Sequence, residues 1–274
     1  MANKIWIFLV CFLLSSLAFG QDYILFINGY RGPKHDHETT NNQLNFKDPT
    51  GYWYALDDSI QRRFPGAKSI YLDAHHPLNT STHLTLGKAV RSYVFSRFCW
   101  IEKESHWVLN QNLNKNGFEI RVENGRKAGK LLKQYLSTQT VGKVHIVCHS
   151  MGYAYMLGIM DMLENQFTFG KALILSPEAA NTAGRNWALF EEVWQYGANA
   201  DVKEADPICF QDGIAPQKAV VGIERLPNST KGGRIYIPKS YPKRKLGFIK
   251  SHHLAYYDWF FWIKPEDNGY FSAD

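Results

Sequence analysis

The stretch Lys143-Val144-His145-Ile146-Val147-Cys148-His149-Ser150-Met151-Gly152 decides how the rest of this chain is interpreted. Residues 144–147 predict a buried strand, and the apolar residues 153–165 favour a helix. Ser150 lies between the two, with the small residues Cys148 and Gly152 two positions away on either side. A serine between a strand and a helix is typical of a nucleophile elbow, a turn so tight that only small neighbours fit. There the backbone N–H of the next residue, Met151, becomes one donor of an oxyanion hole.

This motif resembles the elbow of the α/β-hydrolase family, particularly its secreted bacterial lipases and esterases, which often read His-Ser-Met-Gly. The family usually has glycine where this chain has Cys148, but cysteine is also small. The resemblance implies an α/β-hydrolase fold, with a mostly parallel central sheet and helices on both faces. The alternation of strand and helix patterns along the chain favours the same α/β class.

Further strands are predicted at residues 23–27, 68–72, 172–176, 191–196 and 234–238, and helices at 51–64, 123–137 and 254–263. Gly170 is expected in the turn before the strand at 172–176, and Gly197 is expected to end the strand at 191–196. Residues 79–122 are rich in aromatics without strand periodicity. In the resembled family such segments are often lids or caps, although the aromatics would serve equally well in helix packing.

Length and composition fit one domain over residues 21–274, since 45% of the 274 residues are hydrophobic and no linker or repeat interrupts the chain. Residues 1–20 predict a signal peptide: Lys4 precedes an apolar run, and Ala18-Phe19-Gly20 forms a cleavage site. We therefore expect export, to the periplasm or outside the cell. In such a compartment Cys99 and Cys209 would be able to form a disulfide.

The formal net charge of +6 does not point to nucleic acid, because no basic stripe interleaves with aromatic residues. Lys239, Lys243, Arg244 and Lys245 form the single dense basic loop. That loop either contacts an anionic or lipid surface peripherally or is simply solvated. The sequence does not indicate an oligomeric state.

A serine nucleophile needs a histidine base, and the histidine needs an acid that fixes its tautomer. The resembled family supplies these groups in the order serine, acid, histidine. His252 and His253 both stand where the base is expected, just before the last helix. The His-Leu pairing, similar to that of several lipases, slightly favours His253, and the Ser251-His252 pairing favours His252. His149 is expected to point away from the neighbouring hydroxyl.

The resemblance also implies where the acid and the second oxyanion donor lie. Asp212, in Gln-Asp-Gly-Ile-Ala-Pro, is the first choice of acid, because the family's secreted lipases have a similar Asp-Gly-Leu-Val. Asp201, four residues after Gly197, and Asp206 are alternatives, and Glu178 occupies another position that the family uses. The loop after the first strand, Asn28-Gly29-Tyr30, would offer the Tyr30 N–H to the oxyanion.

The expected activity is hydrolysis of carboxylic esters, of small molecules or lipids, through an acyl-enzyme intermediate. It needs no metal or organic cofactor, and His75 and His76 belong to no cluster with metal-ligand spacing. An amidase, peptidase or thioesterase would use the same three groups. A catalytically silent α/β-hydrolase-fold protein that binds a ligand or partner is the alternative from another class.

Overall fold

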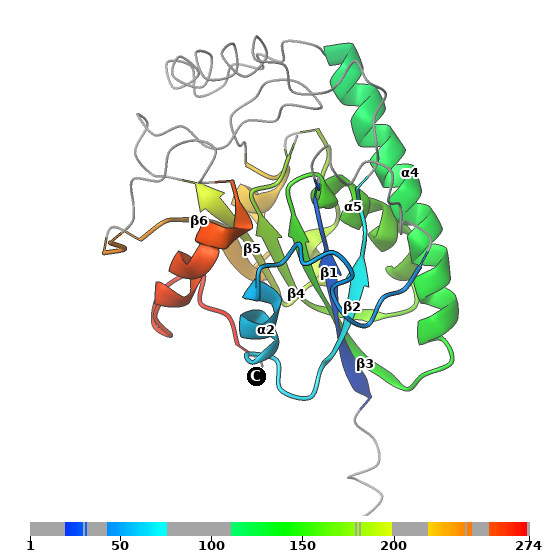
Figure 1. Ribbon diagram of the computed structural model, residues 1–274, viewed down its shortest axis with the longest axis horizontal. Coiled ribbons are helices and arrows are strands. Elements are labelled where there is room, and N and C mark those ends of the chain that lie inside the picture. The colour runs from blue at the N-terminus through cyan, green and yellow to red at the C-terminus, as the bar shows by residue number, and fades with distance from the viewer. Residues whose placement is uncertain are drawn as a thin grey trace, which may run out of the picture.

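Six parallel strands form one open sheet in the order β2-β1-β3-β4-β5-β6 (Figure 1). This computed structural model describes residues 20–29, 31, 43–75, 111–178, 180, 182–198, 219–238, 240–242 and 252–272, with only the backbone for 111–117. The strands are β1 (Gln21–Ile27), β2 (Lys68–Leu72), β3 (Val141–His149), β4 (Thr168–Leu175), β5 (Glu192–Ala198) and β6 (Lys231–Tyr236). β3, which leads into Ser150, lies in the middle of the sheet, so the serine emerges at its centre.

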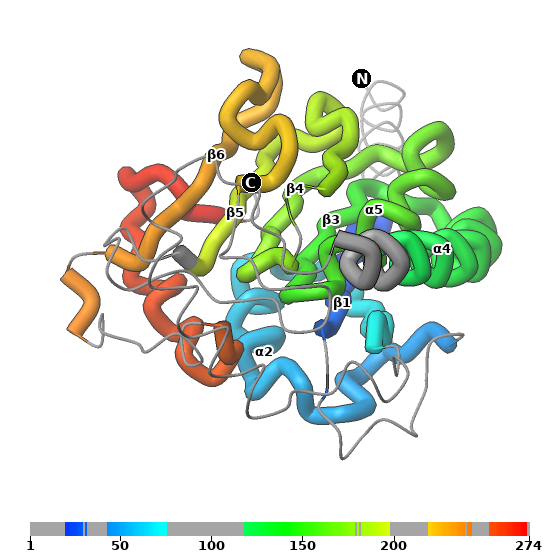
Figure 2. The backbone as a smooth tube through the Cα atoms, turned by 90° about the horizontal axis from the view of Figure 1, so that it is seen from above, coloured from blue at the N-terminus to red at the C-terminus, as the bar shows by residue number. Residues whose placement is uncertain are grey.

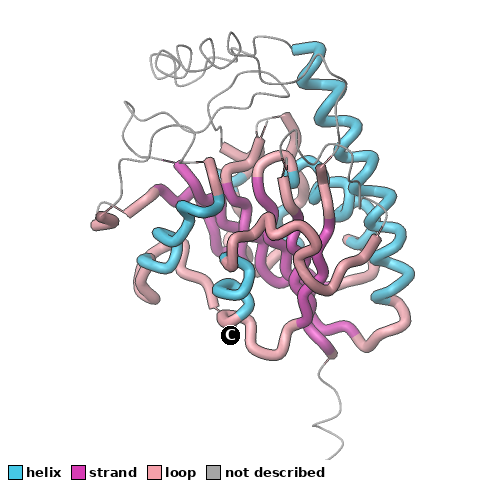
Figure 3. The backbone as a smooth tube through the Cα atoms, viewed as in Figure 1, coloured by secondary structure: helices cyan, strands magenta, loops and turns pink. Residues whose placement is uncertain are grey.

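Helices cover both faces of the sheet, as Figures 1 and 2 show. The long helix α4 (Gln111–Leu136) and α5 (Gly152–Leu163) lie on one face, and α2 (Leu56–Gln61) and the 3-10 helix η5 (Leu254–Trp262) lie on the other. Two short 3-10 helices, η3 (Trp187–Leu189) and η4 (Ile223–Arg225), lie in connections. Figure 3 shows the strands in the middle of the molecule, with helices on either side. This is the α/β architecture that the strand and helix patterns predict.

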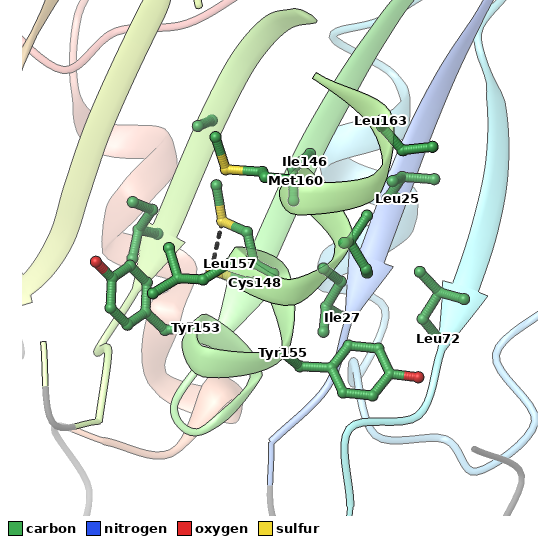
Figure 4. Packing of buried hydrophobic residues seen from close by; sticks show 14 of the residues in the cluster. Leu25, Ile27, Leu72, Ile146, Cys148, Tyr153, Tyr155, Leu157, Met160 and Leu163 are labelled. Carbon is green, nitrogen blue, oxygen red and sulfur yellow. Dashed lines mark hydrogen bonds between the residues drawn. The ribbon is translucent and has the colours of Figure 1, made fainter. Parts of the chain in front are cut away.

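Alternate residues of the central strands divide between two hydrophobic cores, because successive side chains of a strand point to opposite faces. In β1, Tyr23, Leu25 and Ile27 join the core under α4 and α5, whereas Ile24 and Phe26 join the core under α2 and η5. Figure 4 shows α5 lying over β3 and β1 on the first face. Burial on both faces explains why these strands read as continuous apolar runs.

Helices α4 and α5 approach closely because glycines replace side chains where they cross. A Cβ on Gly158 of α5 would overlap the carbonyl oxygen of Val122, and one on Gly125 of α4 would overlap that of Tyr155. The pair forms a tight layer against the sheet, and α5 starts two residues after Ser150. The position of α5 thus depends on these small contacts.

The structure corrects several predicted boundaries. Helix α4 begins at Gln111, inside the 79–122 segment that the sequence assigned to an irregular insertion. Asn112, Asn114, Asn116 and Gly117 have low helix propensity and concealed this start. Residues 79–110, the rest of the expected cap or lid, lie outside the described residues.

Four smaller differences concern a helix start, two glycines and a helix type. Helix α2 starts only at Leu56, because Tyr54 and Ala55 have the left-handed φ angles 52° and 61°. Gly170 lies within β4, and Gly197 lies within β5, where its φ of 118° accompanies a shift of register against β6. The expected last helix is present, but as 3-10 helix.

Some sequence-based predictions lie outside the described residues. These include the signal peptide, apart from Gly20 at its end, and both Cys99 and Cys209. Among the described residues, no helix has the length and apolar character that crossing a membrane requires.

We predict that Gly158→Ala destabilises the protein by about 1–3 kcal/mol, because the added methyl group forces α4 and α5 apart. Urea unfolding followed by circular dichroism measures this change. Lys130→Ala, on the exposed side of α4, is the control and should change the free energy of unfolding by no more than about 0.5 kcal/mol. Equal stability of the two variants would show that the glycine contact does not hold the helix pair.

Candidate functional site

Ser150 occupies a sharp turn between β3 and α5. Its φ of 57° is left-handed, a conformation that costs a non-glycine residue about 1–3 kcal/mol and persists only when its surroundings impose it. Three backbone hydrogen bonds do so: the Ser150 N–H donates to Leu175 O at 3.0 Å, and Ser150 O accepts from Tyr153 N and Glu178 N, each at 3.1 Å. The turn holds the serine at the carboxyl end of the sheet.

The residues two positions before and after Ser150 have no room to be larger. A Cβ on Gly152 would lie 2.5 Å from Asn28 O and 2.8 Å from Ile27 O. Cys148 is fully buried, with its Sγ 3.6 Å from Met156 Sδ beneath α5 (Figure 4). Burial raises the pKa of the Cys148 thiol, so it remains protonated and acts as a small packing residue.

His252 is the histidine that the structure brings to Ser150. Its Nε2 lies 2.9 Å from Ser150 Oγ, within hydrogen-bonding distance. His253, which the sequence slightly favoured, is exposed, and its Nδ1 accepts the Ala255 N–H at the start of η5. The backbone of His253 is extended, and successive side chains of extended chain point in opposite directions, so only one of the two can face the serine.

The other ring nitrogen of His252 is buried. Among the described residues, no group forms a hydrogen bond with this Nδ1. Burial, with a smaller contribution from His253, lowers the pKa of His252 to about 4, so its ring is neutral at pH 7. With Nε2 accepting the serine proton, the neutral ring carries its own proton on Nδ1, and a buried donor without an acceptor costs about 1–3 kcal/mol.

The candidate acids after β5 cannot be compared by position. Asp201, Asp206 and Asp212 all lie in residues 199–218, outside the described part of the chain. Glu178 is buried near the elbow, where its backbone N–H donates to Ser150 O. The structure therefore places a serine hydroxyl against a histidine ring, and no described carboxylate forms a hydrogen bond with the Nδ1 of that ring.

Met151 was expected to supply one oxyanion donor, and its backbone is described. Met151 is buried and immediately precedes the first residue of α5, and within the described residues its backbone N–H has no acceptor. The first N–H groups of a helix have no partner within the helix, and its dipole favours negative charge there. Tyr30, expected to supply the second donor, lies outside the described residues, but its neighbour Gly29 packs directly on Ser150. A Cβ on Gly29 would lie 2.7 Å from Ser150 Cβ.

The loop after β1 is fastened to the loop after β2 by buried polar groups. Asn28 Nδ2 donates to Asp73 Oδ1 at 2.7 Å, while its Oδ1 accepts the Ala74 N–H at 2.6 Å. On the other side of Gly29, the buried Arg31 guanidinium pairs with Asp73 Oδ2 at 2.9 Å. Asp73 thus holds both flanks of the segment that faces the nucleophile.

Tyr52, which is half-buried, and the buried His149 form a second network that the sequence did not reveal. The Tyr52 hydroxyl lies 2.6 Å from His149 Nδ1, and His149 Nε2 lies 2.8 Å from the carbonyl oxygen of His252. Because a carbonyl only accepts, His149 Nε2 carries the proton and the Tyr52 hydroxyl donates to Nδ1. The Gly29 N–H in turn hydrogen-bonds to the Tyr52 oxygen.

The sequence contained only part of the signal for this network. His149 precedes the serine and was expected to point away from its hydroxyl; its ring nitrogens contact the Tyr52 hydroxyl and the backbone of His252. Nothing in the sequence linked Tyr52 to the site, because it precedes α2, nearly 100 positions away from His149 in the chain.

No group of three or more His, Cys, Asp and Glu side chains within the described ranges has a geometry that would hold a metal ion. Comparison with known protein-family profiles and with curated protein sequences finds no match for the chain. The site must therefore be interpreted from its own chemistry.

We predict that His149 makes stability depend on pH. Burial, followed by the nearby His252, lowers the pKa of His149 well below its ordinary value. As pH falls below about 6.5, His149 binds a proton in the unfolded chain but not in the folded state. The free energy of unfolding should therefore fall by up to about 2 kcal/mol between pH 7 and pH 5.

Urea unfolding at both pH values measures the loss. The His149→Gln variant, which has no titrating group at this position, should lose less stability over the same interval. An equal loss in the two proteins would contradict the assignment of a neutral, buried His149.

Proposed function

We propose that this protein is a serine hydrolase that cleaves carboxylic esters with Ser150 as nucleophile and His252 as general base. The observation that carries the proposal is the 2.9 Å contact between His252 Nε2 and the hydroxyl of a serine held in left-handed conformation. A serine alcohol is a weak nucleophile until a base removes its proton, and this contact supplies that base. The geometry favours His252 over His253 for the role.

The surroundings of Ser150 support each later step of acyl transfer. As Ser150 Oγ attacks an acyl carbonyl, its proton passes to His252 Nε2. The developing oxyanion would lie near the Met151 N–H and the N-terminus of α5, where donors and the helix dipole stabilise negative charge. The imidazolium then protonates the leaving alcohol, and water, activated by the same histidine, releases the acid.

The arrangement of the sheet supports placing the chain in the α/β-hydrolase fold. Ligand sites of open α/β sheets lie beyond the carboxyl ends of the strands, and Ser150, Asn28 and Asp73 all follow such ends. Under this proposal residues 79–110 would belong to a cap over the site, before α4 begins. Export by residues 1–20 would expose the enzyme to esters outside the cytoplasm, including lipids.

The buried Nδ1 of His252 supports a third catalytic group, a carboxylate. We retain Asp212 as the first candidate, with Asp201 and Asp206 as alternatives, because the segment that contains all three directly follows β5. A carboxylate at Nδ1 would fix the tautomer that leaves Nε2 free to accept the serine proton. It would also raise the pKa of His252 above the value of about 4 that burial and the nearby His253 give.

We predict that the chain from Gln21 hydrolyses p-nitrophenyl esters. Ser150→Ala should lower kcat/KM by at least about 10³-fold, since only the weaker contributions of the oxyanion site remain. Butyrate and palmitate esters should be compared, because their ratio separates an esterase from a lipase. Ser69→Ala, at a serine on β2 away from the elbow, is the control for handling and folding.

Amides and thioesters become the next substrates if a fluorophosphonate labels Ser150 without ester turnover. A folded wild-type protein that is inert on esters and unlabelled by the fluorophosphonate would overturn the hydrolase proposal. A catalytically silent ligand-binding protein would then be the better account.

The second prediction identifies the acid. Among Asp201→Asn, Asp206→Asn and Asp212→Asn, we expect Asp212→Asn to lower kcat by about 10²–10⁴-fold, because the His252 tautomer is no longer fixed. Its residual activity should also persist to lower pH, since loss of the carboxylate lowers the pKa of His252.

The pH dependence of kcat/KM for the three variants measures both effects. The assignment would move to Asp201 or Asp206 if that variant shows them instead. If none of the three does, the acid is not among these residues.

A further inference from the structure

Tyr52 and His149 connect the three segments that the proposed mechanism needs. His149 belongs to β3 and directly precedes Ser150, Tyr52 lies before α2, and the carbonyl bound by His149 belongs to the base, His252. Gly29, at the centre of the loop facing Ser150, packs against the Tyr52 hydroxyl, because a Cβ there would lie 2.6 Å from that oxygen. Nucleophile, base and oxyanion loop therefore meet in one buried hydrogen-bonded chain.

We propose that Tyr52 and His149 are positioning residues, which hold the His252 ring at hydrogen-bonding distance from Ser150 through the chain Tyr52 Oη–H to His149 Nδ1 and His149 Nε2–H to His252 O. This inference rests on the proposed function for its kinetic consequence. Its structural content, the tautomer of His149 and its hold on His252, does not depend on any activity.

The contacts of His149 with His252 leave little freedom for the base. Besides the 2.8 Å bond to the backbone carbonyl, the two imidazole rings pack with centroids 4.8 Å apart and planes inclined by 40°. Tyr52 and Tyr257 pack around the same His149 ring, at 5.7 Å and 6.1 Å. The His252 main chain and ring are thus both supported by one side chain that itself is enclosed.

His149 has no free ring nitrogen with which to take a proton in place of His252. Both of its ring nitrogens are already engaged, one as acceptor and one as donor, so no site for a second proton is free without breaking the bond from Tyr52. Burial, followed by the nearby His252, lowers the pKa of His149 and so favours its neutral form. When His252 becomes positively charged during acyl transfer, it meets a neutral neighbour and not a second charge.

Tyr52→Phe is the most direct variant, because it removes one hydroxyl and keeps the ring. Misplacement of a catalytic group by about 1 Å can lower a rate by about 10²-fold. We therefore expect Tyr52→Phe to lower both kcat and the rate of Ser150 labelling by a fluorophosphonate by about 10-fold or more, with KM little changed. Tyr196→Phe is the matched control: its hydroxyl is also buried and donates to a carbonyl, Gly269 O, at 2.6 Å.

Thermal unfolding of the two variants separates positioning from stability. Both lose one buried hydrogen bond, so a general loss of structure would slow both alike. Slower Ser150 labelling in Tyr52→Phe than in Tyr196→Phe, at comparable melting temperatures, supports positioning. Equal labelling in both variants would overturn it.

Two amide replacements of His149 test the two ends of the chain. Glutamine can place an amide N–H near the position of Nε2 and keep the bond to His252 O, whereas asparagine can place its amide oxygen near Nδ1 and keep only the bond from Tyr52. We expect His149→Gln to label faster than His149→Asn, by about 10-fold. The opposite order would contradict the role of the Nε2 bond.

Histidine-selective ¹⁵N NMR supplies a readout that does not require turnover. The wild-type spectrum should show His149 as the Nε2–H tautomer, and Tyr52→Phe should shift the His252 ring signals while Tyr196→Phe leaves them unchanged. An Nδ1–H tautomer of His149, or His252 signals insensitive to Tyr52, would overturn the positioning proposal. Inactivity of the wild type toward esters and fluorophosphonate, with the expected spectrum, would instead overturn only the hydrolase proposal.

Discussion

The left-handed turn at Ser150 is the constraint on which the arrangement of this site depends. Its φ of 57° is unfavourable for serine, and the neighbouring strands and α5 impose it through hydrogen bonds to both sides of the residue. The turn fits only because two glycines pack closely around it: Gly152 lies against the carbonyl oxygens of residues 27 and 28, and Gly29 lies against the Ser150 Cβ. The unfavourable backbone conformation of Ser150 is thus maintained by contacts from several strands, loops and α5.

The same packing explains why polar groups accumulate at this end of the sheet. Parallel strands end together, so the loops after β1, β2 and β3 meet, and their buried backbone groups need partners. Asp73 accepts the His75 N–H in the loop after β2 and also binds the side chains of Asn28 and Arg31. His149 donates a hydrogen bond to the His252 carbonyl. Hydrogen bonds that maintain the fold here also determine the distance between serine and histidine.

The sequence predicted the six described strands, because short apolar runs such as residues 23–27 and 172–175 are typical of buried strands. Helix starts were less predictable: left-handed Tyr54 and Ala55 delay α2, and asparagines hide the beginning of α4. The elbow was visible because it is local in sequence. The choice between His252 and His253 was not, since it depends on how a distant segment packs on His149. Tyr52 had no sequence signal for the same reason.

The account's central claim is that His252 activates Ser150. The rates at which a fluorophosphonate labels Ser150 in the wild type, His252→Ala and His253→Ala test this claim most directly, because labelling reports the reactivity of the nucleophile without the natural substrate. We predict that His252→Ala slows labelling by about 10²-fold or more, since the alcohol loses its base, and that His253→Ala labels at nearly the wild-type rate. Rapid labelling in His252→Ala, or loss of labelling in His253→Ala alone, would contradict the account.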